Sequence, residues 1–163
     1  MATNLENNIN SQVLRLFIYP DIVARDKNGN PVLLVDVGVR TIEPQVSRQI
    51  TDSLEQANGS IPFAMLVNLA QITIFKWSRD NWQQPISVFN TADVLSRYEP
   101  EFTNKRIFHT YFTSLVEAWL RDLAYHWHSQ HPPFLEEIKS IGLLEKLADG
   151  TTEEETDVVE VMI

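Results

Sequence analysis

Two aspartates stand at positions from which they could do chemistry together. Asp21 and Asp36 each lie among apolar residues, in the segments LFIYPDIVAR and VLLVDVGV, which the residues DKNGNP separate. Both segments are typical of strands, and Asn28-Gly29 supplies the positive φ angles that a two-residue hairpin turn requires. Counting outward from such a turn places Asp21 directly opposite Asp36. Opposed residues lie on the same face of a sheet, with Cβ atoms about 4.5–5.5 Å apart.

The same count fixes the neighbouring pairs and has one alternative. It sets Val23 opposite Leu34 and Arg25 opposite Val32. A three-residue loop with a bulge at Gly29 would instead slip the pairing by one residue and send the two acids to opposite faces. We favour the two-residue turn, because Asn-Gly is the sequence that such turns prefer.

Two carboxylates at this spacing need something that offsets their repulsion. A shared divalent cation, a bound proton, a nearby basic side chain or exposure to solvent would each do so. A two-carboxylate site suits Mg²⁺ or Mn²⁺, which prefer oxygen ligands, and such a site typically supports attack of water on a phosphodiester. The two-residue period of a strand adds Gly38 and Arg40 to the face of Asp36. Arg40 is therefore the expected salt-bridge partner of Asp36.

The rest of the chain alternates helical and strand patterns. FAMLVNL, QITIFKW and ISVFN are typical of strands. Apolar spacing predicts helices over residues 4–14, 44–58, 91–97 and 104–129, and a last helix or helix pair after Pro132-Pro133. The longest helix carries one apolar stripe of Phe108, Phe112, Leu115, Trp119, Leu123 and Trp127.

The end of the chain differs in composition from the rest. We expect a single domain over residues 1–150 and an acidic tail over residues 151–163. The tail has the composition of a disordered segment as far as Asp157. Its apolar end, VVEVMI, could add a strand to a neighbour or bind a partner's groove.

The segment YPDIVARDKNGNPVLLVDVGVR, followed by PQVSRQITDSLEQA and FAMLVNLAQITIFKW, resembles the PD-(D/E)xK nuclease superfamily. It is most similar to short bacterial, often cyanobacterial, proteins grouped as Uma2-like or nuclease-like. Those proteins order a YPDIV strand, a DKNG turn, a VEVK-type strand, a helix and a strand pair that ends in Trp-Lys. The resemblance covers about residues 5–77 and implies a restriction-endonuclease-like core with an added helical C-terminal part.

The resemblance also implies roles for the residues of the hairpin. Asp21 matches the aspartate of the family's PD and Asp36 its D/E position, so both would hold the metal. Gly38 falls where the family keeps the lysine that positions and polarises the attacking water. Arg40 lies on the same face, but a guanidinium stays protonated and replaces that lysine poorly. The nearby polar residues that could help are Glu6 on the first helix and Gln45, Arg48 and Gln49 on the next.

Composition restricts the partners. The chain of 163 residues has no cysteine and a net charge of −9, which disfavours a broad DNA-binding surface. No apolar run suggests a membrane span and no secretory leader is evident, so we expect a cytoplasmic protein. His126, His128 and His131 lack the spacing of a metal site on one helix face, and we interpret them as polar residues at a helix end.

These observations predict a nuclease-fold protein whose active centre is degenerate and which acts by protein–protein contact. We expect a homodimer, with the helix over residues 104–129 as its interface. One alternative is an active Mg²⁺-dependent or Mn²⁺-dependent DNA endonuclease that uses Asp21 and Asp36, with Arg40 beside them. The other alternative is a nucleic-acid-binding module without cleavage. Whether the chain is an enzyme stays open, because the lysine is missing.

Overall fold

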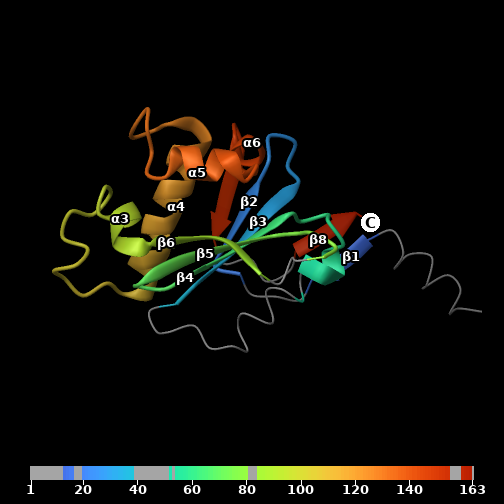
Figure 1. Cartoon of the computed structure of the whole chain (residues 1–163), viewed down its shortest axis with the longest axis horizontal. Helices are drawn as coiled ribbons and strands as arrows, with labels where there is room; N and C mark the ends of the chain where they lie inside the picture. Colours follow the sequence, from blue (N-terminus) through green and yellow to red (C-terminus); the bar gives the residue numbers. More distant parts are fainter. Residues whose placement is uncertain are drawn as a thin grey trace, which may run out of the picture.

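A mixed six-stranded sheet forms the centre of the molecule (Figure 1). The computed structural model describes residues 13–16, 20–38, 52, 54–80, 84–154 and 159–162. The strand order is β6-β5-β4-β3-β2-β7, and only the β3–β4 pair is parallel. The strands are β2 (Ile22–Arg25), β3 (Pro31–Val37), β4 (Phe63–Val67), β5 (Gln71–Lys76), β6 (Pro85–Asn90) and β7 (Thr151–Glu154). The fold class is thus α/β, as the alternation of patterns predicts.

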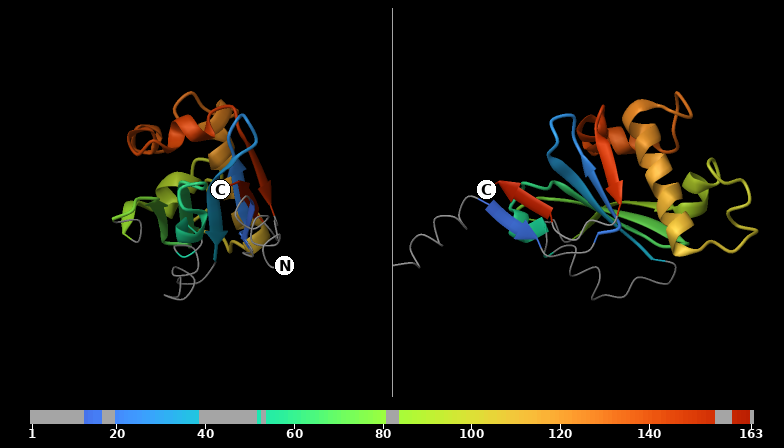
Figure 2. Two further views of the ribbon diagram at one scale, coloured as in Figure 1. Left: turned by 90° about the vertical axis from the view of Figure 1, so that its right-hand side faces the viewer. Right: turned by 180° about the vertical axis from the view of Figure 1, so that it is seen from behind.

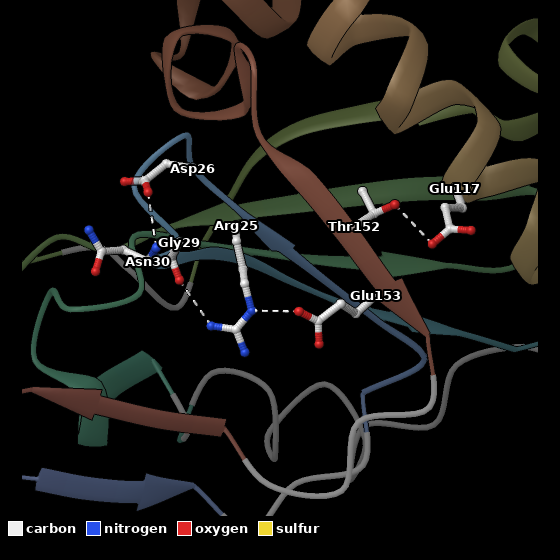
Figure 3. Close-up of polar contacts among 7 residues, drawn as sticks. All are labelled: Arg25, Asp26, Gly29, Asn30, Glu117, Thr152 and Glu153. Carbon is white, nitrogen blue, oxygen red and sulfur yellow. Dashed lines mark hydrogen bonds and ion pairs between the residues drawn. The ribbon is translucent and has the colours of Figure 1, made fainter.

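The β2–β3 hairpin closes through a three-residue loop, so the predicted two-residue turn is wrong. Asp26 N–H donates to Asn30 O at 2.9 Å, and Gly29 N–H donates to Asp26 O at 3.0 Å. Gly29 has φ +87°, which glycine adopts without the steric cost of a Cβ. The Asp26 carboxylate accepts the N–H of Asn28 at 2.9 Å and the N–H of Asn30 at 3.0 Å. Figure 3 shows the contact with Asn30 and the hydrogen bond that Arg25 Nη1 donates to Gly29 O.

A second irregularity restores the predicted register in the body of the hairpin. Arg25 pairs with Pro31 rather than with Val32, but a β-bulge follows between Arg25 and Ala24. Beyond it, Val23 pairs with Leu34 and Ile22 with Val35, as predicted. The loop shifts the pairing by one residue and the bulge shifts it back.

Helices cover one face of this sheet (Figures 1 and 2). They are α3 (Thr91–Leu95), α4 (His109–Tyr125), α5 (Leu135–Ser140) and α6 (Leu143–Leu147). Four members of the predicted α4 stripe, Phe112, Leu115, Trp119 and Leu123, are buried against the sheet. The other two members, Phe108 and Trp127, lie just outside α4, which is shorter than the predicted helix over residues 104–129, and they are 64% and 50% exposed. The part of the stripe within α4 therefore belongs to the core of one chain and not to a surface that a second chain could use.

The opposite face carries a smaller apolar cluster. Leu54 and Ala57, from the helical residues 54–57, pack with Leu34, Leu66 and other side chains of the sheet. Most of the predicted helix over residues 44–58 lies outside the described residues, as do residues 4–12 of the predicted first helix. The last two residues of that predicted helix, Val13 and Leu14, instead belong to strand β1 (Val13–Leu16).

The acidic C-terminal segment forms strands, which corrects the expectation of disorder drawn from its composition. Strand β7 pairs with β2 at the edge of the main sheet, and β8 (Val159–Met162) pairs with β1 in a separate two-stranded sheet. Arg25 Nε binds Glu153 Oε1 at 2.9 Å, and Thr152 Oγ1 donates to Glu117 Oε2 on α4 at 2.9 Å (Figure 3). These contacts hold an acidic strand that has little apolar surface to bury.

No helix among the described residues is both long and apolar enough to cross a membrane.

Candidate functional site

The hairpin brings Asp21 and Asp36 together, as its register predicts. Asp21 directly precedes β2, and its N–H donates to Val35 O at 2.9 Å, so the backbone bond falls on the residue paired with Ile22, one position before Asp36. Asp36 lies in β3 between Val35 and Val37, which face the larger core. The carboxyl group of Asp36 therefore points to the same side of the sheet as Leu34, where Asp21 meets it.

A proton offsets the repulsion between the two acids. Burial, the hydrogen bond to Asp21 and the negative charge of Asp21, in this order of size, together raise the pKa of Asp36 to about 7. The charge of His109 acts in the opposite sense. Below about pH 7 the protonated Asp36 can therefore donate a hydrogen bond to the Asp21 carboxylate. Of the four ways to offset the repulsion, the geometry thus favours the shared proton.

Groups of the chain itself occupy both oxygens of Asp21. Asp21 Oδ2 accepts the N–H of Val37 at 2.7 Å. Asp21 Oδ1 lies 3.1 Å from His109 Nε2, which is also 3.0 Å from Val37 O. Since both of these oxygens are acceptors, Nε2 carries the hydrogen. His109 is the first residue of α4, so this helix places a donor at the two-carboxylate site.

Sequence reasoning missed His109. The residue lies 72 positions from Val37, and no spacing rule connects an isolated histidine to a distant strand. The histidines that the sequence did single out do not converge: His126 Nδ1 contacts Ser129 O, whereas the His128 ring packs on Trp127. The interpretation of those histidines as residues of a helix end is consistent with the left-handed conformation of His126 at the C-cap of α4.

Gly38, at the position of the family's lysine, contributes a backbone hydrogen bond to the sheet. Gly38 N–H donates to Val67 O at 2.8 Å, which continues the pairing of β3 with β4. Arg40 lies outside the described residues, so its expected salt bridge to Asp36 stays a prediction. The other polar residues proposed to assist, Glu6, Gln45, Arg48 and Gln49, also lie outside them.

Asp21 and Asp36 are the two carboxylates that the sequence predicts as metal ligands, and the structure brings them together. In the part of the chain that the structure describes, no group of three or more His, Asp or Glu side chains is placed to hold a metal. A cation would find two carboxylates, Asp21 and Asp36, of which the first already accepts two contacts. Mg²⁺ is commonly held by one or two carboxylates together with waters and substrate phosphates, so these two side chains could serve as its protein ligands.

A groove of about 680 Å³ opens beside His109. Its lining includes Lys105, Arg106 and Phe108 and contains no acidic residue. Lys105 forms an ion pair with Glu99, and this hydrogen bond is the main reason that the pKa of Glu99 falls to about 2. The Arg106 guanidinium lies 5.0 Å from the centre of the Phe108 ring, and this ring is 64% exposed. The groove thus combines positive charge with an accessible aromatic surface.

Comparison with known proteins gives no further assignment. No family model matches the chain, and no significant match exists among curated proteins or solved structures.

Proposed function

We propose that this chain is a nuclease-like domain whose acid pair does not cleave, and that it acts by contact with other protein chains. The proposal adopts the restriction-endonuclease-like core that the hairpin sequence suggests. One observation carries it: Asp21 and Asp36 meet as they would in a metal site, yet a proton, the Val37 N–H and His109 already satisfy them. Gly38 supplies no side chain to activate water.

Supercoiled plasmid DNA tests the proposal directly. The wild-type chain is incubated with Mg²⁺ or Mn²⁺ and compared with Asp21→Ala. We expect equal and negligible nicking by both proteins, because Gly38 stands at the lysine position and supplies no side chain that activates water. Nicking by the wild type that is lost in Asp21→Ala would contradict the proposal, and it would support the Mg²⁺-dependent or Mn²⁺-dependent endonuclease instead.

The groove beside His109 favours two alternative functions, which both involve contact with nucleic acid. Its cations, Lys105 and Arg106, could contact phosphates, and the exposed Phe108 ring could stack on a base. Both the active endonuclease and the non-cleaving nucleic-acid-binding module would use such a surface. The net charge of −9 opposes them at long range.

Binding to a labelled single-stranded oligonucleotide separates these functions. Retention of the oligonucleotide by the wild type and its loss in Arg106→Gln, without nicking, would favour the binding module. Arg97→Gln serves as the matched control, since Arg97 contacts Ser129 and the carbonyl of His131 and does not line the groove.

A further inference from the structure

Strand β6 forms an open edge of the main sheet. It pairs with β5 on one side only, and no described strand lies on its other side. Alternate N–H and C=O groups of an edge strand point outward and can pair with another strand. Ile86 and Val88 are 43% and 52% exposed on one face of this strand, whereas Phe89 on the other face is buried against Phe134 and Trp119.

The charge pattern of the two edges differs sharply. The residues of β6, PISVFN, include no charged side chain. The strand at the other edge, β7, ends in the exposed pair Glu153 and Glu154. Charged residues on an edge strand discourage pairing, as do proline and β-bulges. Pro85 and the bulge at Ile86 therefore confine the open edge of β6 to its second half, residues 87–90. Because the whole chain carries −9, contact between two copies meets less repulsion at an edge without charged side chains than at the acidic β7.

We infer that β6 is a dimer interface, in which two copies of the chain pair their β6 strands antiparallel about a twofold axis. A second copy meets every requirement of this edge: it offers a strand with free edge groups, no charge, and Ile86 and Val88 on the matching face. Such a contact is self-complementary, as a twofold interface must be. The inference rests on the protein-contact role proposed above, and it replaces the buried stripe of α4 as the expected surface for homodimer formation.

Light scattering of the full chain at several concentrations tests this interface. We expect twice the monomer mass of 18.8 kDa for the wild type. Val88→Lys places a charge near its symmetry mate and should weaken the dimer at least about tenfold. Tyr125→Lys is the matched control, because Tyr125 is 49% exposed on α4, and it should leave the dimer intact. Circular dichroism verifies that both variants are folded.

Cysteine cross-linking gives a second readout, because the chain contains no cysteine of its own. Near a twofold axis the opposed Cβ atoms lie about 4.5–5.5 Å apart, which is close enough for a disulfide after small adjustments. Oxidised Val88→Cys should migrate as a covalent dimer. Thr151→Cys, exposed on the other edge strand, should stay monomeric.

Three results would overturn the interface: a wild type that is monomeric at every concentration, a Val88→Lys variant that is as dimeric as the wild type, or equal cross-linking of the two cysteine variants. The nicking assay distinguishes failure of the β6 interface from failure of the proposed function. A monomeric wild type that does not nick DNA refutes the β6 dimer alone. A dimer that nicks DNA through Asp21 refutes the non-cleaving role alone.

Discussion

At the scale of single residues, Asp36 shows how its surroundings raise the pKa of a carboxyl group. Its carboxyl group is half-buried beside Asp21, and burial disfavours the charged form. His109 reduces this effect from the other side of Asp21 but does not cancel it. A residue that retains a proton near neutral pH is a poorer metal ligand there, because a metal must first displace that proton.

The raised pKa of Asp36 predicts a pH-dependent stability. The unfolded chain releases this proton near pH 3.8 and the folded chain near pH 7. The folded state therefore binds more protons between these values, and stability falls as pH rises through this window and is constant above it. Asp36→Asn should abolish this loss of stability at high pH, because the amide does not ionise and its NH2 group can still donate a hydrogen bond to Asp21. With solvent screening of a half-buried group allowed for, we expect a gain of about 1–2 kcal/mol at pH 8.

Thermal unfolding with a chelator present measures this effect. The melting temperature of Asp36→Asn should exceed that of the wild type by roughly 5 °C at pH 8, and the difference should vanish near pH 4. Asp80→Asn, at an exposed position, provides the baseline. A difference that stays constant from pH 4 to pH 8 would show that Asp36 has no raised pKa.

At the scale of elements, the hairpin and β7 depend on each other through close backbone contact. A Cβ added to Gly150 would stand 2.0 Å from Arg25 O and 3.1 Å from Leu147 O, so any side chain there forces the start of β7 away from β2. Gly29 at the turn is different, because a Cβ there meets nothing within 4 Å and only its φ of +87° is unfavourable.

Two alanine substitutions measure this contrast. Gly150→Ala should lower the free energy of unfolding by about 3 kcal/mol, because the backbone must shift. Gly29→Ala should cost only about 1 kcal/mol, the penalty of a left-handed conformation. Urea denaturation compares the two variants with the wild type. Equal losses would mean that β7 does not pack against β2 as closely as the structure has it.

At the scale of the whole molecule, the sequence predicted what local pattern controls. The opposed aspartates, the strands of the sheet and the stripe of α4 all follow from spacing along the chain. The contacts that it did not predict join distant segments: Arg25 binds Glu153 across 128 positions, and His109 reaches Val37 across 72. The three-residue loop of the hairpin was the alternative to the favoured two-residue turn, but the bulge between Ala24 and Arg25, which restores the inner register, was not predicted.

The arrangement of the molecule also explains where contact with other chains is expected. The helices bury their apolar stripes on one face of the sheet, and the acidic β7 closes one edge. The uncharged β6 remains as the open edge, with Ile86 and Val88 accessible. The proposed association thus uses a strand edge and not the two-carboxylate site.

The most direct test of the central claim is the melting temperature of the wild type titrated with Mn²⁺ at pH 7. A ligand at a hundredfold excess over its dissociation constant would stabilise the folded state by about 2.7 kcal/mol. We predict no saturable rise, and the same flat curve for Asp36→Asn, because Asp21 and Asp36 are satisfied by the proton, the Val37 N–H and His109. A saturable rise in the wild type that is absent in Asp36→Asn would contradict the account.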